Sequence, residues 1–150
     1  MERLSKDYKR IVIKIGSSLL TSKEALVHVV RQIAQLMGQK RQIILVSSGA
    51  IAYGMKMLNL KKRPAKLDLL QAAASLGQSE LMRFYVDKFQ PYNIKCAQIL
   101  LTWDDFKDHT RYLNSRHTLE ALLKLGALPI INENDSVSVE EIKFGDTDHL

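Results

Sequence analysis

Short apolar segments alternate with longer amphipathic segments along this chain. RIVIKI (10–15), QIILV (42–46), IKCAQILLT (94–102) and LPIIN (128–132) have the length and composition of buried strands, and EEIKF (140–144) is a weaker fifth. Strands that are apolar on both faces and alternate with helices predict a parallel sheet covered on both sides. We therefore expect an α/β fold.

The segments between these strands are predicted to be helical. In 24–37 the apolar residues recur on one helical face, namely Leu26, Val29, Val30, Ile33, Leu36 and Met37. A longer helical segment from 67 to 89 is expected to be interrupted near Gly77, and a third helix is expected over 115–126. Since no segment reads as a linker or a repeat, we expect one domain over residues 1–150.

The composition excludes several classes of protein. The chain is 46% hydrophobic and 25% charged, as is usual for globular proteins. No segment approaches the roughly 18 consecutive apolar residues that a membrane span requires, and no apolar stretch follows the N-terminal charges as in a secretory signal. The single cysteine, Cys96, lies in a predicted strand and fits a core thiol in a reducing compartment. We expect a cytoplasmic protein with no membrane partner.

The chain is basic, with a net charge of +6, and its densest basic segment is KMLNLKKRPAK (56–66). This segment is either a patch for anions or nucleic acid or a solvated loop between helices, the latter indicated by Pro64. No aromatic residue that could stack on a base lies among its charges. We therefore favour the solvated loop and expect no nucleic-acid partner.

Small polar or acidic residues follow every predicted strand. They are Gly16-Ser17-Ser18, Ser47-Ser48-Gly49-Ala50, Thr102-Trp103-Asp104-Asp105, Asn132-Glu133-Asn134-Asp135 and Gly145-Asp146-Thr147-Asp148. In open parallel sheets ligands bind at the carboxyl ends of the strands. The pattern therefore predicts a binding site at this edge of the sheet.

Two of these strand ends carry features suited to anions. Lys14 lies within an apolar strand, where it either reaches water from an edge strand or extends over Gly16 toward a phosphate. After the second strand, backbone N–H groups of Ser48, Gly49 and Ala50 could point at an anion. Neither GxGxxG nor a Walker-type GxxxxGK is present, so either a carboxylate or a phosphate could bind at this turn. The alternative is a tight strand-to-helix turn that needs glycine for its dihedral angles.

The last two strand ends add acceptors. Asp135 could hold an ammonium group, and Asp146 and Asp148 could orient lysines or a metal-bound phosphate. Asn134 and these aspartates could equally serve in turns and helix caps. The four histidines lack metal-ligand spacing and no GxSxG elbow occurs, so we assign no protein metal ligands and do not favour a hydrolase.

Together, these segments resemble the amino acid kinase family. KIGSSLLT, LVSSGAIAYG, AAASLGQSELM, AQILLT and PIINENDSVSVEEIKFGDTD are similar, in order and spacing, to successive motifs of the branch that phosphorylates glutamate. The resemblance implies a three-layer α/β/α sandwich with a mainly parallel open sheet, incomplete in this chain. Residues 1–150 would be the N-terminal, glutamate-binding part of a kinase domain, with the ATP-side half absent.

The implied activity is ATP-dependent phosphorylation of the side-chain carboxylate of L-glutamate, which gives glutamyl 5-phosphate in the first step of proline biosynthesis. The resemblance also implies Mg²⁺ as a cofactor, assembly into a homo-oligomer and feedback inhibition by proline. A glutamate carboxylate, with an unperturbed pKa of about 4.3, is already ionised at neutral pH. The reaction therefore needs alignment and positive charge rather than a general base.

The resemblance also implies roles for individual residues. Lys14 would contact the transferring phosphoryl group, with Gly16 and Ser17 in the phosphate-binding turn. Asp148 would organise the active-site lysines. The glutamate-binding residues would be Ser48, Gly49, Ala50, Asn134, Asp135, Asp146 and Thr147. Thr147 replaces the asparagine typical of the family, so it keeps a hydroxyl but loses the amide.

Three other functions stay open from the sequence. The chain could belong to a kinase of another carboxylate or of a carbamate, or it could be an amino-acid-binding module without catalysis. A basic nucleic-acid binder that uses residues 56–66 is the third. Activity of the 150-residue chain by itself does not follow from any of its motifs.

Overall fold

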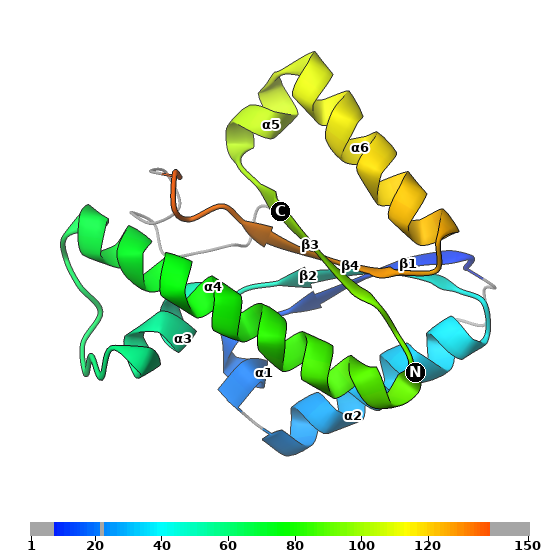
Figure 1. Ribbon diagram of the computed structural model, residues 1–150, viewed down its shortest axis with the longest axis horizontal. Helices are drawn as coiled ribbons and strands as arrows, with labels where there is room; N and C mark the ends of the chain where they lie inside the picture. Colours follow the sequence, from blue (N-terminus) through cyan, green and yellow to red (C-terminus); the bar gives the residue numbers. More distant parts are fainter. Residues whose placement is uncertain (1–7, 22, 139–150) are drawn as a thin grey trace, which may run out of the picture.

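The computed structural model describes residues 8–21 and 23–138 (Figure 1). In chain order its elements are β1 (Arg10–Ile15), α1 (Ser17–Thr21), α2 (Lys23–Gly38), β2 (Gln42–Ser47), α3 (Ala50–Met57), α4 (Leu67–Phe89), the 3₁₀ turn η1 (Gln90–Tyr92), β3 (Cys96–Leu101), α5 (Trp103–Lys107), α6 (His109–Lys124) and β4 (Leu128–Glu133). The four predicted strands that fall in this part of the chain are all present. EEIKF, the fifth, lies outside the described residues.

The strands form one open sheet in the order β1-β2-β4-β3, and every neighbouring pair is parallel. The register places Ile15 beside Ser47, Val46 beside Ile131 and Leu100 beside Asn132. Helices flank both faces of the sheet (Figure 1). The α/β prediction with a parallel sheet is therefore confirmed.

The larger core lies between the sheet and the helices α2 and α4. From α2 it takes Leu26, Val30 and Ile33, three of the residues predicted to share one helical face. The strands and α4 complete it with Ile15, Ile43, Leu45, Leu128 and Ile130 and with Leu81, Tyr85 and Phe89. These side chains are almost fully buried, and their removal from water is the main stabilising contribution on this face.

The opposite face of the sheet carries a smaller cluster under α6. It comprises the buried residues Val46, Leu101 and Ile131, with Ile44, Ile99 and Leu119 packed against them. On this face β1 departs from the expectation of a strand buried on both sides, because Val12 is 62% exposed and Arg10 and Lys14 are exposed as well. β1 alternates between an inward apolar face and an outward one, as an edge strand does.

α4 runs without a break through Gly77, so the predicted interruption is wrong. A Cβ at Gly77 would lie 1.8 Å from the carbonyl oxygen of Ala50, and one at Gly54 would lie 1.7 Å from the carbonyl oxygen of Ala73. The two glycines thus let the backbones of α3 and α4 touch. Glycine here permits close packing of two helices rather than ending one.

α6 begins at His109, six residues before the predicted start at 115. The Asp108 side chain caps it by accepting a hydrogen bond from the backbone N–H of Arg111 at 2.7 Å. Just before it, Thr102 and Asp105 form a capping box around α5. The start was missed because the first two turns of α6 are polar and show little apolar periodicity. In the part of the chain that the structure describes, none of the helices is both long and apolar enough to cross a membrane.

Candidate functional site

The carboxyl ends of β1, β2 and β4 lie side by side, as the parallel topology requires. The backbone N–H and the hydroxyl of Ser48 both donate to the carbonyl oxygen of Ile15, at 3.2 and 3.3 Å. Farther along the same edge, at the ends of β4 and β3, the N–H of Asn134 donates to the carbonyl oxygen of Leu101 at 2.8 Å. The polar residues that follow these strands therefore meet at one edge.

The turn between β2 and α3 depends on Gly49. Its φ of 103° lies in the left-handed region that favours glycine, and a Cβ there would lie 2.7 Å from Cδ1 of Leu20. α3 begins directly after this turn, at Ala50. Ser48 is buried, and its hydroxyl is used within the fold through the bond to Ile15.

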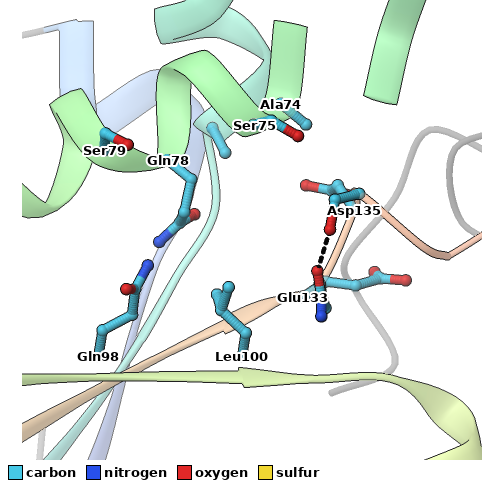
Figure 2. Close-up of a pocket in the computed structure, with 11 residues that line it drawn as sticks. Ala74, Ser75, Gln78, Ser79, Gln98, Leu100, Glu133 and Asp135 are labelled. Atoms are coloured by element: carbon cyan, nitrogen blue, oxygen red, sulfur yellow. Dashed lines mark hydrogen bonds between the residues drawn. The ribbon is translucent and has the colours of Figure 1, made fainter. Parts of the chain in front are cut away.

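A pocket of about 280 Å³ lies beside this turn (Figure 2). It is lined by Ala50, Ala74, Ser75, Gln78, Ser79, Gln98, Leu100, Glu133, Asn134, Asp135 and Ser136. Its walls come from the start of α3, the middle of α4, the edge strand β3 and the segment that leaves β4. The predicted residues Ala50, Asn134 and Asp135, far apart in sequence, are brought together here.

Other predicted residues lie outside this pocket lining. Lys14 is exposed on the outer face of β1, and Gly16 follows it at the strand end with open space where a Cβ would project. Ser17 begins α1. Asp146, Thr147 and Asp148 lie outside the described residues, so their predicted roles stay predictions.

Asp135 is an acidic residue of the pocket lining whose pKa is perturbed. Burial raises the pKa of its carboxyl from 3.8 to about 6, and the positive charge of Arg63 counters part of that rise. Arg63 belongs to the basic segment 56–66, which begins in the last turn of α3 and continues as a mostly exposed loop to α4, as favoured from the sequence. One cation of that loop therefore acts on the pocket.

A buried hydrogen-bonded chain of polar groups lies beside the pocket, and its two ends, Gln78 and Glu133, belong to the pocket lining. The sequence did not assign this chain a role. The backbone N–H of Glu133 donates to Oδ1 of Asn132 at 2.9 Å, and Nδ2 of Asn132 donates to Oε1 of Gln78 at 2.8 Å. Gln78 lies in a family-like motif, but its burial on the inner face of α4 is visible only in three dimensions. The signal that could have found it is a glutamine on the apolar face of a helix.

Glu133, at the end of β4, is almost fully buried. One carboxylate oxygen, Oε1, accepts a hydrogen bond from the Ser138 hydroxyl, and the Ser138 carbonyl accepts one from Nε2 of Gln71 at 3.3 Å. Its other oxygen, Oε2, is buried and has no hydrogen-bond partner within residues 8–21 and 23–138. These bonds hold the segment 134–138 against α4.

Below the site, a second buried polar contact ties β2 to α4. The Ser47 hydroxyl and the Tyr85 hydroxyl lie 2.7 Å apart, and Tyr85 is fully buried. Burial raises the pKa of the Tyr85 phenol to about 12. Tyr85 is therefore a neutral structural group.

Comparison with known proteins gives concordant results. Residues 9–150 match the model of the amino acid kinase family. The chain is similar to proteins named glutamate 5-kinase from Thermus thermophilus (50% identity) and Aromatoleum aromaticum (53% identity), with 95% of this chain and 40% of each relative covered. A third, from Burkholderia mallei, is 50% identical over 100% of this chain and 42% of its own.

The fold has a counterpart among solved structures. A crystal structure of a protein from Streptococcus mutans UA159 superposes with a TM-score of 0.55 at 17% identity and covers 83% of this chain and 58% of that one. At that identity the match concerns the fold alone. The chain spans about 40% of the length of the curated relatives it matches. On the match over residues 9–150, the chain belongs to the amino acid kinase family.

Proposed function

We propose that this chain forms the glutamate-binding part of a glutamate 5-kinase. The enzyme transfers the terminal phosphoryl group of ATP to the side-chain carboxylate of L-glutamate, which gives glutamyl 5-phosphate and opens proline biosynthesis. Relatives that carry this name are 50–53% identical to the chain. The observation that carries the proposal is the pocket at the carboxyl edge of the sheet, where Asp135, Asn134 and Ala50 come together.

The chemistry of this pocket suits an amino acid. A ligand ammonium beside Asp135 would compensate the cost of ionising that half-buried carboxyl, whose pKa is raised to about 6. Amide groups of Asn134, Gln78 and Gln98 in the pocket lining can bond to a carboxylate. The pocket lining thus offers an acidic group for the ammonium and amide groups for a carboxylate, and it contains no basic side chain.

The transfer itself needs no base from this chain, because the nucleophile is a carboxylate that is ionised at neutral pH. We propose that Lys14, beside the turn of Gly16 and Ser17, places positive charge near the transferring phosphoryl group. The open space at Gly16 supports this role. For Asp148 we propose the orientation of active-site lysines, and for Asp146 and Thr147 contacts to glutamate.

When bound, ATP supplies the phosphoryl group and Mg²⁺ neutralises charge on the phosphates. Over residues 8–21 and 23–138 there is no group of three His, Cys, Asp or Glu side chains arranged to hold a metal ion. We therefore assign no described residue to Mg²⁺. The proposed contribution of this part of the chain is to bind and orient glutamate.

We also propose a cytoplasmic homo-oligomer that is inhibited by proline and binds neither nucleic acid nor membranes. Assembly and inhibition by proline rest on the resemblance to the family. The location and the absence of membrane and nucleic-acid partners rest on the composition and on the lack of aromatic residues in the basic segment. Sedimentation of the protein that carries this chain tests its assembly. Addition of proline to a glutamate titration tests the inhibition.

The decisive experiment is calorimetric titration of the chain with L-glutamate, with L-aspartate and carbamate as competitors. We expect selective binding of L-glutamate, weakened at least about tenfold by Asp135→Asn, since that change removes the charge facing the ammonium. Asp87→Asn, at an exposed position of α4, is the matched control. Preference for another carboxylate would point to a different substrate, and equal binding by the Asp135→Asn variant would contradict the placement of the ammonium.

A further inference from the structure

We propose that the side-chain amide of Gln78 is a specificity-determining group, which donates a hydrogen bond from Nε2 to a carboxylate of the ligand. The inference deepens the proposed function and rests on it for the identity of the ligand. It comes from the orientation of the buried amides of Gln78 and Asn132.

The orientation of these amides follows from a backbone N–H, which can only donate. Because the N–H of Glu133 donates to the Asn132 side chain at 2.9 Å, the Asn132 atom facing it is the oxygen Oδ1. The amino group of Asn132 therefore faces Gln78, 2.8 Å away, and the Gln78 atom that accepts is Oε1. The remaining group of Gln78 is then its amino group, whose orientation is fixed without reference to any ligand.

This amino group faces the pocket. Gln78 lines it and is 9% exposed, and Figure 2 shows its nitrogen pointing away from Glu133 and toward Gln98. Within the described part of the chain, no hydrogen bond of Nε2 is found. The structure thus holds a nearly buried donor in place and leaves it available to a ligand.

A second amide faces it from the opposite wall. Gln98 lies on β3 beside Ile130, so its side chain projects from the same face of the sheet as the core under α4. Figure 2 shows the Gln78 and Gln98 side chains pointing toward one another across the pocket. Two facing amides can offer two N–H donors to the two oxygens of one carboxylate.

The neutral character of these donors matters for selectivity. A ligand without an acceptor at this point would leave the Gln78 amino group buried and unpaired, which costs affinity and rejects that ligand. With Asp135 available for an ammonium, the pocket would select a ligand that carries both charges. The geometry therefore favours an amino acid over a simple dicarboxylate.

The variant Gln78→Glu tests this assignment with little change in shape. A glutamate side chain keeps an oxygen that can accept the bond from Asn132, but it replaces the amino group with a second acceptor. We expect the affinity for L-glutamate at neutral pH to fall at least about tenfold. Gln35→Glu, the same change on an exposed part of α2, is the control and should bind as the unaltered chain does.

Two ligands identify the carboxylate that Gln78 binds. L-glutamine carries an amide in place of the side-chain carboxylate, and L-isoglutamine carries one in place of the α-carboxylate. An amide can donate to the carboxylate introduced by Gln78→Glu, so the loss of affinity should be smaller for whichever ligand has its amide at that point. The difference between the affinity losses that Gln78→Glu causes for the two ligands therefore shows which carboxylate of glutamate contacts Gln78.

A spectroscopic measurement keeps the inference independent of the folding of the variant. The Gln78 side-chain NH₂ resonances of the unaltered chain should shift on titration with L-glutamate. If glutamate binds but these resonances stay in place and Gln78→Glu binds equally well, the inference is wrong and the proposed function stands. If glutamate does not bind but other amino-acid carboxylates shift them, the donor assignment stands and the substrate is wrong. If no carboxylate shifts them, the inference is overturned.

Discussion

Asp135 is placed where its negative charge costs free energy until a cation reaches it. Desolvation raises the pKa of its carboxyl to about 6, and Arg63 compensates only part of the effect. Such perturbed acids are common in binding sites, because the group that binds a ligand cation is there at the expense of the stability of the free protein. The residue can therefore be tested through stability as well as through binding.

The pKa of Asp135 predicts how folding stability changes with pH. The carboxyl holds its proton more tightly when folded (pKa about 6) than when unfolded (pKa 3.8), so its contribution is full in acid and is lost as pH rises through about 6. The loss is at most about 3 kcal/mol. Asp135→Asn should therefore be the more stable protein at pH 7, with the difference vanishing toward pH 4. Urea unfolding across this range measures it; a pH-independent difference would contradict the argument.

The Ser47–Tyr85 contact predicts an asymmetric pair of variants. The Ser47 hydroxyl donates to the carbonyl oxygen of Ser48 at 3.2 Å, which leaves Tyr85 as the donor to Ser47. Ser47→Ala leaves the fully buried Tyr85 hydroxyl without an acceptor and should lower the stability by about 2–3 kcal/mol. Tyr85→Phe removes the donor itself and should lower the stability by about 1 kcal/mol. The double variant should recover part of the Ser47→Ala loss in urea unfolding. Simple additivity of the two losses would speak against this reading.

At the scale of elements, the contact between α3 and α4 positions one side of the pocket. Gly54 and Gly77 let the two backbones meet, so that Ala50 at the start of α3 lies against the turn of α4 that carries Gln78. A side chain at either glycine would hold the helices apart. The pocket wall thus depends on two missing Cβ atoms.

Gly77→Ala should therefore destabilise the fold strongly, although alanine is the better helix former. Its Cβ would fall 1.8 Å from the Ala50 carbonyl oxygen, a backbone atom that cannot move without displacing α3. We expect a loss of about 3 kcal/mol or more, together with weakened glutamate binding, because Ala50 and Gln78 separate. Gly38→Ala, with nothing within 4 Å of the added Cβ, should be neutral or slightly stabilising. Thermal unfolding measures the stability of the two variants, and calorimetry measures their affinity for glutamate. Equal stability and affinity of the two variants would refute the close-packing account.

The elements themselves followed from sequence where the pattern was strong. The four strands of the described sheet and the face of α2 were predicted, because buried strands and an amphipathic helix have distinct periods. Gly77 was misread because a glycine that ends a helix and one that admits a neighbouring helix look alike in one dimension. The role proposed for Gln78 rests on its hydrogen bond with Asn132, 54 residues away in the sequence, which no sequence pattern reveals. Asn134 and Asp135 were predicted from their place after a strand, which the topology of parallel sheets makes informative.

For the molecule as a whole, the sheet separates two cores of unequal size. The face toward α2 and α4 buries eleven residues in one cluster, while the face under α6 buries three. Successive residues of a strand point to opposite faces, so β4 contributes to both. Pro129 and Ile130 are almost fully buried, and Ile131 is 9% exposed. Stability should therefore depend far more on the first face than on the second.

Ile130 and Ile131 make this asymmetry measurable, because they are identical neighbours on the central strand β4. Ile130 belongs to the larger core and is 1% exposed, so Ile130→Ala should leave a cavity among atoms that cannot collapse into it, at a cost of about 4 kcal/mol. Ile131→Ala opens the smaller cluster, which can relax toward solvent, at about 2 kcal/mol. Both variants keep β4 and its hydrogen bonds. Urea unfolding at fixed pH compares them, and an equal or reversed order of losses would show that the α6 face holds the sheet as firmly as the other.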